Sequence, residues 1–196
     1  MIAIVDYNAG NVYSVVFALK RLGVNPVLTD DKAILRFADK VIFPGVGEAK
    51  TTMDYLKKNQ LDRLIKELKQ PVLGICLGMQ LMCSYSEEGD TECLGIFDVP
   101  VRKFIRKNQE EKIPHTGWNT LSDLKSELYC ELPEESYAYF VHGYYVPVNP
   151  DTIARTNHIL NFSASLYKNN FYATQFHPEK SGKIGEQILS NFLKIR

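Results

Sequence analysis

The stretch Pro71-Val-Leu-Gly-Ile-Cys-Leu-Gly-Met-Gln80 joins an apolar run to a G-x-C-x-G sequence. The run Pro71–Ile75 is typical of a buried strand, and Met79–Cys83 begins a predicted helix. A cysteine at such a strand-to-helix turn is the thiol analogue of the G-x-S-x-G nucleophile elbow. Glycines two positions to either side let the neighbouring backbone approach without Cβ clashes. The pattern predicts an α/β fold with Cys76 at one edge of its sheet.

Strand and helix patterns alternate over the first 85 residues. Helical spacing runs from Val12 to Leu22, ends at Gly23, and returns between Met53 and Leu68 with an interruption near Asn59. The remaining predicted strands of this half are Ile2–Val5, Pro26–Thr29 and Lys40–Phe43. This alternation implies a parallel sheet covered on both faces, with the chemistry at the carboxyl ends of its strands.

The second half is richer in short β-like runs. We expect strands at Val99–Ile105, Tyr137–Val141, Tyr144–Val148, Phe162–Leu166 and Phe171–Thr174. A closing helix is predicted from about 183 to 193. The chain has 196 residues and shows no internal repeat or linker, so a single domain over residues 1–196 is the economical interpretation.

Charge and hydropathy exclude several classes of function. Lys and Arg balance Asp and Glu at 23 each, whereas nucleic-acid-binding proteins usually carry a basic excess. The longest apolar runs are far too short to span a bilayer. The amino-terminal run reads as a buried strand without a basic lead-in. We therefore expect a cytoplasmic protein with neither a nucleic-acid nor a membrane partner.

The four cysteines suggest neither a metal site nor a redox motif. They are Cys76, Cys83, Cys93 and Cys130, and no pair has C-x-x-C spacing. In a reducing compartment all should be free thiols. Cys83, Cys93 and Cys130 are interpreted as small buried hydrophobes. Cys76 is the exception because of its elbow, where the following helix favours the thiolate form.

A thiol nucleophile needs a base, because only a few per cent of a free cysteine, with its pKa of about 8.5, is thiolate at neutral pH. The candidates are His115, His142, His158 and His177. His177 differs from the others because it follows the predicted strand Phe171–Thr174, and Glu179 stands two residues later. Glu179 is placed to orient the imidazole and stabilise its cation. The predicted catalytic triad is Cys76, His177 and Glu179.

Acyl transfer also requires donors for the developing oxyanion. The backbone N–H of Leu77, directly after the nucleophile, supplies one. The loop Pro44-Gly45-Val46-Gly47 follows another strand, and its glycines allow the backbone to reorient, so it is the candidate for the second donor.

The segments Gly74–Gln80 and Gln175–Ser181 together resemble the class I (triad) glutamine amidotransferases. The resemblance covers nearly the whole chain and implies a flavodoxin-like α/β fold, with a mixed, mostly parallel sheet and helices on both faces. It also implies that Cys76 attacks the side-chain amide of L-glutamine. A glutamyl thioester forms, ammonia leaves, and water releases glutamate. No cofactor and no metal are expected.

Further motifs resemble one branch of that family. Pro114–Asn119 is similar to its P-H-x-G-W-N segment and Tyr139–Tyr144 to its Y-F-V-H-S-Y segment; Asp6–Asn11 and Pro44–Gly47 also fit. The branch is HisH, the glutaminase subunit of imidazole glycerol phosphate synthase in histidine biosynthesis. It implies a heterodimer with HisF, a (β/α)₈-barrel cyclase subunit that uses the ammonia to form imidazole glycerol phosphate and AICAR.

The resemblance assigns roles to individual residues. Glutamine would be held by Gly45, Gln80, Gly143 and Tyr144. The Val46 N–H, beside Gly47, would become an oxyanion donor after a backbone flip. Asn11, Trp118, Tyr139 and Lys180 would lie towards the cyclase subunit, although Trp118, the only tryptophan, could also be a core residue. We hypothesise that the Val46 loop stays misoriented until the loaded partner docks, because an unregulated glutaminase would waste glutamine.

Two positions depart from the branch pattern, and three alternatives stay open. Gly143 replaces a usual Ser or Thr, which removes a hydroxyl near the substrate, and Thr116 replaces a larger apolar residue, which would loosen local packing. The alternatives are a cysteine peptidase or hydrolase on a similar fold, a non-catalytic module, and a paralogous amidotransferase that supplies ammonia to a surface-sugar pathway. The intact triad argues against the second, and Gly143 keeps the third open.

Overall fold

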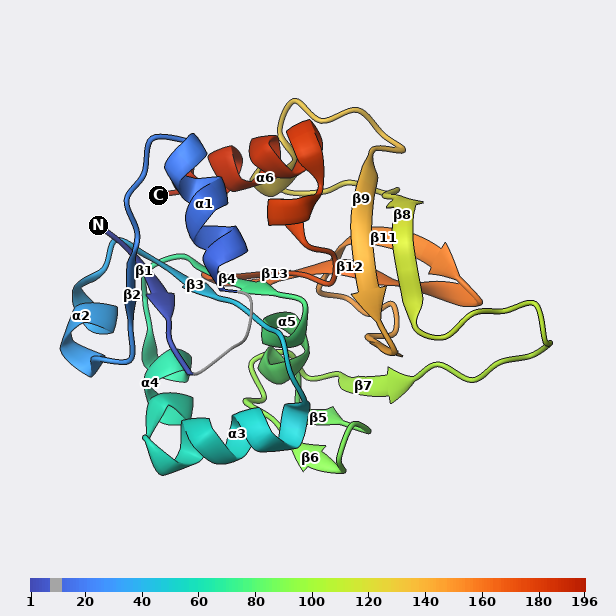
Figure 1. The fold of residues 1–196 in the computed structure, drawn as a ribbon, viewed down its shortest axis with the longest axis horizontal. Coiled ribbons are helices and arrows are strands. Elements are labelled where there is room, and N and C mark those ends of the chain that lie inside the picture. Colours follow the sequence, from blue (N-terminus) through green and yellow to red (C-terminus); the bar gives the residue numbers. More distant parts are fainter. Residues whose placement is uncertain (8–11) are drawn as a thin grey trace.

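A computed structural model describes residues 1–7 and 12–196 and is built around a seven-stranded sheet (Figure 1). In chain order the elements are β1 (Ile2–Val5), α1 (Tyr13–Arg21), β2 (Val27–Thr29), α2 (Lys32–Phe37), β3 (Lys40–Phe43), α3 (Ala49–Lys58), α4 (Leu61–Glu67), β4 (Val72–Ile75), α5 (Leu77–Met82), β5 (Tyr85–Ser86), β6 (Thr91–Glu92), β7 (Pro100–Lys103), β8 (His115–Thr120), β9 (Tyr137–His142), β10 (Tyr144–Tyr145), β11 (Thr152–His158), β12 (Leu160–Lys168), β13 (Phe171–Thr174) and α6 (Gly182–Lys194). Short 3₁₀ helices span Glu127–Tyr129 and Pro178–Lys180.

The main sheet is mixed and mostly parallel, as the resemblance implied. Its strand order is β11-β12-β13-β4-β3-β1-β2. The strands from β13 to β2 pair in parallel, and β12 and β11 add an antiparallel hairpin at one edge. The strands β3, β4 and β13 are direct neighbours, so the segments that follow them, the Pro44 loop, the Cys76 elbow and the His177 loop, meet at one edge of the sheet.

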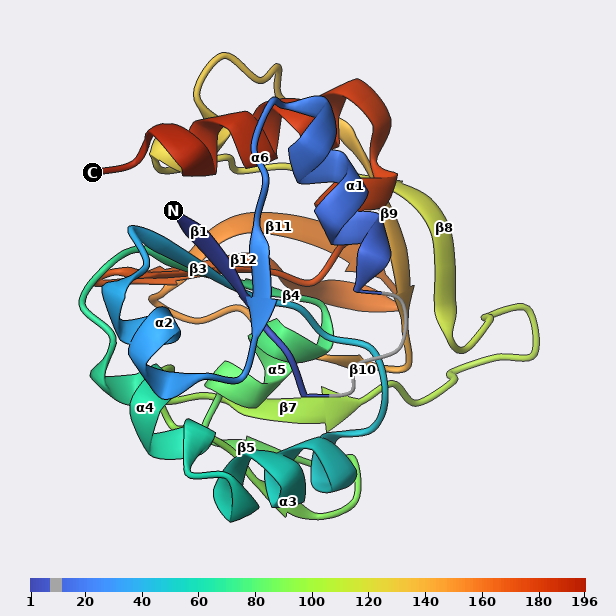
Figure 2. The ribbon, with the colours of Figure 1, turned by 60° about the vertical axis from the view of Figure 1, so that its left-hand side comes forward.

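Helices cover both faces of this sheet. Figures 1 and 2 show α1 and α6 on one face and α3, α4 and α5 on the other. Side chains of β1 alternate between two apolar clusters: Ala3 and Val5 join the cluster with Met53 of α3, while Ile4 joins the one with Leu19 of α1. Burial on both faces explains why these strands are continuous apolar runs rather than alternating ones.

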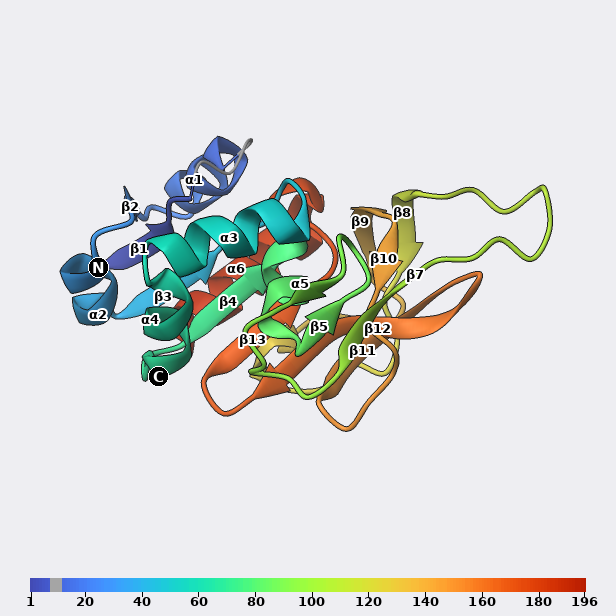
Figure 3. The same ribbon diagram turned by 90° about the horizontal axis from the view of Figure 1, so that it is seen from below.

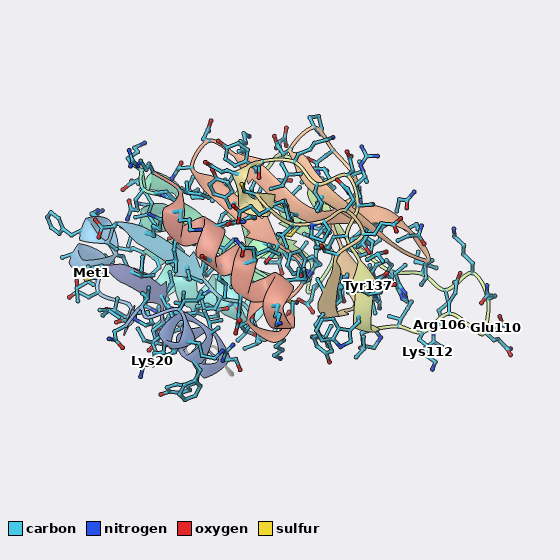
Figure 4. All side chains as sticks on the ribbon, turned by 90° about the horizontal axis from the view of Figure 1, so that it is seen from above. Met1, Lys20, Arg106, Glu110, Lys112 and Tyr137 are labelled. Atoms are coloured by element: carbon cyan, nitrogen blue, oxygen red, sulfur yellow. The ribbon has the colours of Figure 1, made fainter. Side chains whose placement is uncertain are left out.

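The second half of the chain adds smaller sheets beside the edge where the chemistry is expected. The strands β10, β7, β5 and β6 form one, and β8 pairs with β9 in an antiparallel ribbon. Between β7 and β8 the chain projects away from the body (Figure 3), and Figure 4 shows Arg106, Glu110 and Lys112 on this projection. In residues 1–7 and 12–196, no helix has the length and apolar character that crossing a membrane requires.

Some elements differ from the expectation. The helix α2 was missed, although Asp31 marks its start by accepting from the backbone N–H groups of Ala33 and Ile34. The strands β8 and β11, and the short β5 and β6, were also missed. The expected strand Tyr144–Val148 was too long, because only Tyr144–Tyr145 forms β10, and Pro147 has no N–H to offer a neighbouring strand.

Candidate active site

Cys76 lies between β4 and α5 in a strained backbone conformation. Its φ is 53° and its ψ is −108°, outside the regions that non-glycine residues normally adopt. Its N–H donates to the carbonyl of Thr174 at the end of β13, over 2.7 Å. Such strain persists only when the surrounding structure enforces it, and it is typical of functional sites. The sharp elbow predicted at Cys76 is therefore present.

The glycines around the elbow are required by close backbone contacts. A Cβ on Gly78 would lie 2.1 Å from the carbonyl oxygen of Phe43, and one on Gly74 would lie 2.9 Å from the sulfur of Met82. A Cβ on Gly45 would lie 2.1 Å from the Gly78 nitrogen and 2.6 Å from the Leu77 Cα. The loop that follows β3 thus rests directly on the elbow, which brings the predicted oxyanion segments together.

His177 and Glu179 form a buried pair beside Cys76. The Nδ1 of His177 lies 2.7 Å from Oε1 of Glu179, and their side chains are only 3% and 4% exposed. The other carboxylate oxygen of Glu179, Oε2, is buried without a hydrogen-bond partner. Since an ionised carboxylate is costly to bury unpaired, the orientation of Glu179 depends on the imidazole. The structure brings the three predicted triad residues together.

The electrostatics of His177 favour its cation. Burial by itself would lower the pKa of His177, but hydrogen bonds to Cys76 and Glu179 and the negative charge on both groups raise it to about 10. A nearby opposite charge favours the ionised form of a titratable group. The site therefore favours an imidazolium between a carboxylate and the sulfur, the charge state that activates cysteine nucleophiles.

Hydrogen bonds of Ser181 hold the loop that carries His177 in place. The Ser181 hydroxyl donates to the His177 carbonyl over 2.7 Å and accepts from the Tyr139 N–H of β9 over 2.9 Å. The His177 N–H donates to the Tyr139 carbonyl over 2.9 Å. A Cβ on Gly185 of α6 would lie 1.8 Å from the Pro178 carbonyl oxygen. The position of His177 is thus fixed by β9 and by the first turn of α6.

Tyr7, at the end of β1, anchors the candidate oxyanion loop. Its hydroxyl donates to the carbonyl of Pro44 over 2.6 Å, and its ring packs edge-on against Phe43. Burial and the charge of Cys76 raise the pKa of Tyr7, while a hydrogen bond from the Val46 backbone partly opposes them. The Val46 backbone thus lies near the Tyr7 oxygen. No role for Tyr7 was predicted from the sequence.

A cavity of about 350 Å³ opens over the elbow, a size suited to a small ligand. Its lining includes nearly every predicted substrate, oxyanion and catalytic position; the residues are Gly45, Val46, Gly47, Cys76, Leu77, Gln80, Glu88, Pro114, Val141, His142, Gly143, Tyr144, His177 and Lys180. Gln80 donates to the Tyr144 carbonyl over 3.2 Å and to Oε1 of Gln175 over 2.9 Å. The four predicted substrate residues thus line one cavity.

Glu88 is a site residue that the sequence did not reveal. It is half-buried in the cavity wall, and its carboxylate accepts from the N–H of Ala49 at the start of α3 over 2.9 Å. Burial raises the pKa of Glu88, and the Ala49 hydrogen bond opposes that shift. Among the cavity-lining residues that the structure describes, it is the only acidic side chain. Glu88 lies in the run Glu87-Glu88-Gly89-Asp90, which reads as an ordinary polar turn.

The two departures from the branch pattern lie in open surroundings. A Cβ on Gly143 would have no atom within 4 Å, so the missing hydroxyl leaves space and causes no strain. Thr116 is exposed on β8, opposite Val141. The expectation that Thr116 loosens local packing was wrong, because its side chain faces away from the core.

The predicted partner residues lie on the outward face of the β8–β9 ribbon and beside it. Trp118 is 55% exposed, which excludes the core alternative, and its ring meets that of Tyr139 at a centroid distance of 6.0 Å. Lys180 is exposed and reaches the rim of the cavity. Asn11, the fourth position, lies outside the described residues. Contact of these residues with a partner stays a prediction.

The remaining cysteines are free thiols, as expected. Cys83 and Cys93 are buried, but Cys130 is exposed, so its assignment as a small buried hydrophobe was wrong. It closes a short 3₁₀ turn at the surface instead of packing inward. Among residues 1–7 and 12–196, no three His, Cys, Asp or Glu side chains are grouped as ligands of a metal ion.

Sequence comparisons point to one family. The model of class-I glutamine amidotransferases matches residues 3–195. The imidazole glycerol phosphate synthase subunit HisH of Bacteroides fragilis (strain YCH46) is 62% identical over 194 residues, with 99% of each chain covered. The subunits of the same name from Bacteroides thetaiotaomicron and Yersinia pseudotuberculosis are 61% and 44% identical, again with 99% of each chain covered.

Solved structures with lower sequence identity share the fold. A glutamine amidotransferase superposes with a TM-score of 0.76 at 18% identity, covering 99% of this chain and 98% of its own. Another, from Thermotoga maritima, has a TM-score of 0.62 at 16% identity and covers 98% and 82%. At such identities the likeness concerns the fold alone.

Proposed function

Because the chain belongs to the class-I glutamine amidotransferase family, among the HisH subunits of imidazole glycerol phosphate synthase, we propose that Cys76, His177 and Glu179 are the triad with which it hydrolyses glutamine. The observation that carries this assignment is the buried His177–Glu179 pair next to a strained cysteine, at the floor of a cavity that fits an amino acid. A peptidase or a non-catalytic module would not account for the relatives named HisH.

The chemistry follows from these positions. The Cys76 sulfur attacks the side-chain carbonyl carbon of glutamine, and the carbonyl π electrons move onto its oxygen. When the tetrahedral intermediate collapses, the C–N bond breaks and the His177 imidazolium gives its proton to the leaving nitrogen, which departs as ammonia. The product at this stage is a glutamyl thioester. His177 then takes a proton from water, which attacks the thioester, and the sulfur leaves with release of glutamate.

The cavity offers complementary groups for the substrate. We assign Glu88 to the α-ammonium group of glutamine, because it is the only carboxylate among the described residues that line the cavity. Gly45, Gln80, Gly143 and Tyr144 stay our candidates for holding the rest of the molecule. Leu77 N–H is one oxyanion donor, and Val46 N–H, with the flexible Gly47 next to it, is the other after reorientation.

The chain is the glutaminase subunit of imidazole glycerol phosphate synthase, in histidine biosynthesis. Relatives of this name at up to 62% identity favour that pathway over a surface-sugar pathway. The finer proposal is a heterodimer in which the barrel subunit HisF receives the ammonia. Trp118, Tyr139 and Lys180 would face it, since Lys180 lines the cavity, Trp118 and Lys180 are exposed, and the Tyr139 ring contacts that of Trp118. Keeping ammonia near the acceptor prevents its loss as ammonium in solvent.

A cytoplasmic location and a single domain over residues 1–196 complete the proposal. Both are expected from the sequence, and both accord with a biosynthetic subunit whose relatives match it along 99% of their length.

The contacts of Tyr7 support the hypothesis of a misoriented oxyanion loop. The Tyr7 hydroxyl donates to the Pro44 carbonyl and so restrains the loop that carries Val46. Docking of the loaded partner would have to reorient the Val46 N–H towards the substrate oxyanion while Tyr7 holds the start of the loop. The backbone of Gly47, at φ 122°, can accommodate the change.

The test is a glutaminase assay of the lone chain and of its complex with the barrel synthase subunit. Activity should require Cys76, so Cys76→Ser should abolish ammonia release, while Cys130→Ser, a surface cysteine change, should leave it intact. Glutamate production by the Cys76→Ser protein at the unmodified rate would overturn the triad. Absence of co-purification with the barrel subunit would overturn the partner assignment alone.

The same assay tests the loop. Tyr7→Phe removes the hydroxyl and should raise the unstimulated activity of the lone chain, with a smaller increase on adding the partner and its ligand. The matched control is Tyr85→Phe, which removes a surface hydroxyl that donates to Asp90. Full activity of the unmodified lone chain would contradict the regulatory hypothesis.

A further inference from the structure

Polar groups outside the triad form a continuous hydrogen-bond chain that ends at the nucleophile. It begins at Asn119 on β8, and His142, Tyr144 and Gln80 along it line the substrate cavity. In order, its members are the Asn119 amide, His115, His142, the Tyr144 carbonyl, the Gln80 amide, the Gln175 amide and the sulfur of Cys76. His115 and Gln175 are buried and have no place in the proposed triad chemistry.

The Tyr144 carbonyl fixes the direction of the chain at its centre. It lies 2.6 Å from Nδ1 of His142 and 3.2 Å from Nε2 of Gln80. A carbonyl oxygen can only accept, so both nitrogens must carry the hydrogen. The His142 tautomer and the Gln80 amide orientation are thereby set by the same atom.

On the side of the Tyr144 carbonyl that leads to the sulfur, the orientation of each side-chain amide is fixed by the amide or carbonyl before it. The Nε2 of Gln80 also lies 2.9 Å from Gln175, so the Gln175 atom that faces it must be the acceptor Oε1. The Nε2 of Gln175 then faces the Cys76 sulfur at 3.7 Å. Gln175 has no exposed surface, so its amide N–H is shielded from bulk solvent. The sulfur thus has an N–H donor besides His177.

On the surface side of the Tyr144 carbonyl, the chain runs through His142 and His115, and both of these histidines must be neutral. Burial lowers the pKa of His142 to about 3 and that of His115 to about 4. Neutral His142 donates from Nδ1, so its Nε2 accepts from Nδ1 of His115 at 2.9 Å. The Nε2 of His115 then accepts from the Asn119 amide at 3.1 Å. That amide also donates to the Asn157 carbonyl at 2.9 Å, which independently requires the same direction.

We propose that Gln175 is a further catalytic residue whose amide N–H stabilises the anionic sulfur of Cys76, and that His142, backed by His115, is a positioning residue that holds the Tyr144 carbonyl on which the Gln80 and Gln175 amides are aligned. As a thiol, Cys76 donates to the Val141 carbonyl over a long contact of 3.9 Å. As a thiolate, it accepts from Gln175. A hydrogen bond to the charged form favours that form and is stronger than a neutral one. The inference rests on the proposed role of Cys76 as nucleophile.

The test is the pH profile of alkylation by iodoacetamide, read by mass spectrometry at Cys76, with the exposed Cys130 of the same chain as internal reference. Gln175→Glu keeps an acceptor for Gln80 but turns an oxygen towards the sulfur. It should slow Cys76 alkylation near pH 7 at least about tenfold and move the profile to higher pH, because one charge-assisted bond is lost. His115→Phe, which preserves a flat ring against Phe140, should shift the profile in the same direction by a smaller amount.

The matched control is Thr156→Val, which removes a buried hydroxyl that has no partner and lies outside the chain. It should leave the Cys76 profile unchanged. If Gln175→Glu and His115→Phe both give the unmodified profile, the proposed chain is wrong even though the triad stands. If Cys76→Ser retains glutaminase activity, the triad itself is wrong. The alkylation profile and the glutaminase assay therefore separate the two failures.

Discussion

His177 and His142 are buried to nearly the same degree, with 2% and 6% of their surfaces exposed, yet their pKa values shift in opposite directions. His177 faces the Glu179 carboxylate and the Cys76 sulfur, which offset its burial. His142 faces a carbonyl and the neutral His115, and burial prevails. Burial alone favours the neutral form of a histidine, and only a paired anion reverses that preference.

The two histidines accordingly suit different tasks. A cationic His177 can give a proton to the leaving nitrogen, which a general acid must do. A neutral His142 has one donor and one acceptor, so it can accept from His115 and donate to the Tyr144 carbonyl, which holds that carbonyl in place. The difference between the two histidines should therefore change when their partners, the pH or the backbone beside them is altered.

The largest effect is expected from Glu179→Gln, which removes the anion that distinguishes His177. The pKa of His177 should fall, and glutaminase activity of the partner-bound complex should drop about 10²–10⁴-fold, since the imidazole loses both orientation and charge stabilisation. Imidazole NMR and steady-state kinetics measure the two effects. The control is Glu127→Gln, whose carboxylate accepts from Tyr172 away from the site. Full activity with a lowered pKa of His177 would show that the cation is unnecessary.

The triad could be predicted from the sequence because its residues lie in short motifs that directly follow predicted strands. Cys76 and His177 each lie in a short motif directly after a strand, and Glu179 is two residues from His177, so parallel pairing alone brings them together. Gln175 was part of the quoted motif, yet its contact with the sulfur depends on Gln80, 95 positions away. Tyr7 and Glu88 likewise act through distant neighbours, Pro44 and Ala49.

The fold shows the same division. Strands buried on both faces, such as β3 and β4, were predicted nearly to the residue because continuous apolar runs mark them. The strand β8 was missed because its sequence, His-Thr-Gly-Trp-Asn-Thr, is mixed, and it is stabilised by pairing with β9 about twenty residues later. Local sequence patterns predict strands whose side chains are buried on both faces of the sheet. A strand such as β8, which depends on pairing with a neighbouring strand, becomes evident only in the tertiary structure.

The next largest effect comes from His115 and His142, the neutral pair. Their resistance to protonation should make the folded protein lose stability in acid. In the unfolded chain, histidines protonate near pH 6.5, whereas His115 and His142 resist protonation in the fold until about pH 4 and about pH 3. The unfolded state therefore binds more protons, and the free energy of unfolding should fall as the pH drops below about 6, approaching about 1.4 kcal/mol per pH unit for each histidine. Urea denaturation at several pH values measures this slope.

His177 should give the opposite slope on the alkaline side. Its folded pKa of about 10 lies above the unfolded value, so its contribution is complete below about pH 6.5 and is lost as the pH rises towards 10. The control for the acid limb is the double variant His115→Phe/His142→Phe, which should flatten that limb and leave the alkaline one. An acid slope that persists in the double variant would assign it to other groups.

A smaller effect is expected when a carboxylate is placed beside His115, one member of the neutral pair. In Asn119→Asp, one oxygen can keep the Thr120 N–H, but the other faces His115 and the Asn157 carbonyl. The pKa of His115 should rise, and the free energy of unfolding near pH 7 should fall by about 1–2 kcal/mol, because a donated hydrogen bond is replaced by repulsion. NMR of the imidazole and chemical denaturation provide the measurements.

The matched change is Asn161→Asp, on the exposed end of the neighbouring hairpin, where Asn161 accepts from Asn157. It should leave the pKa of His115 and the stability nearly unchanged. If Asn119→Asp also leaves the pKa of His115 low, a nearby anion is not enough to raise the pKa of a buried histidine here. The difference between His177 and His142 would then have a cause other than their hydrogen-bond partners.

The smallest effect is expected at Gly143, which links His142 to the Tyr144 carbonyl. Its Cβ position is open, so Gly143→Ser should change the free energy of unfolding by no more than about 0.5 kcal/mol. The new hydroxyl lies at the cavity wall and should lower the KM for glutamine about twofold to tenfold, the value of one hydrogen bond. Gly143→Ala separates the hydroxyl from the added carbon. An equal fall of KM in both variants would mean that restraining the backbone between His142 and Tyr144 matters more than the hydroxyl, which would place substrate affinity under the control of the neutral histidine chain.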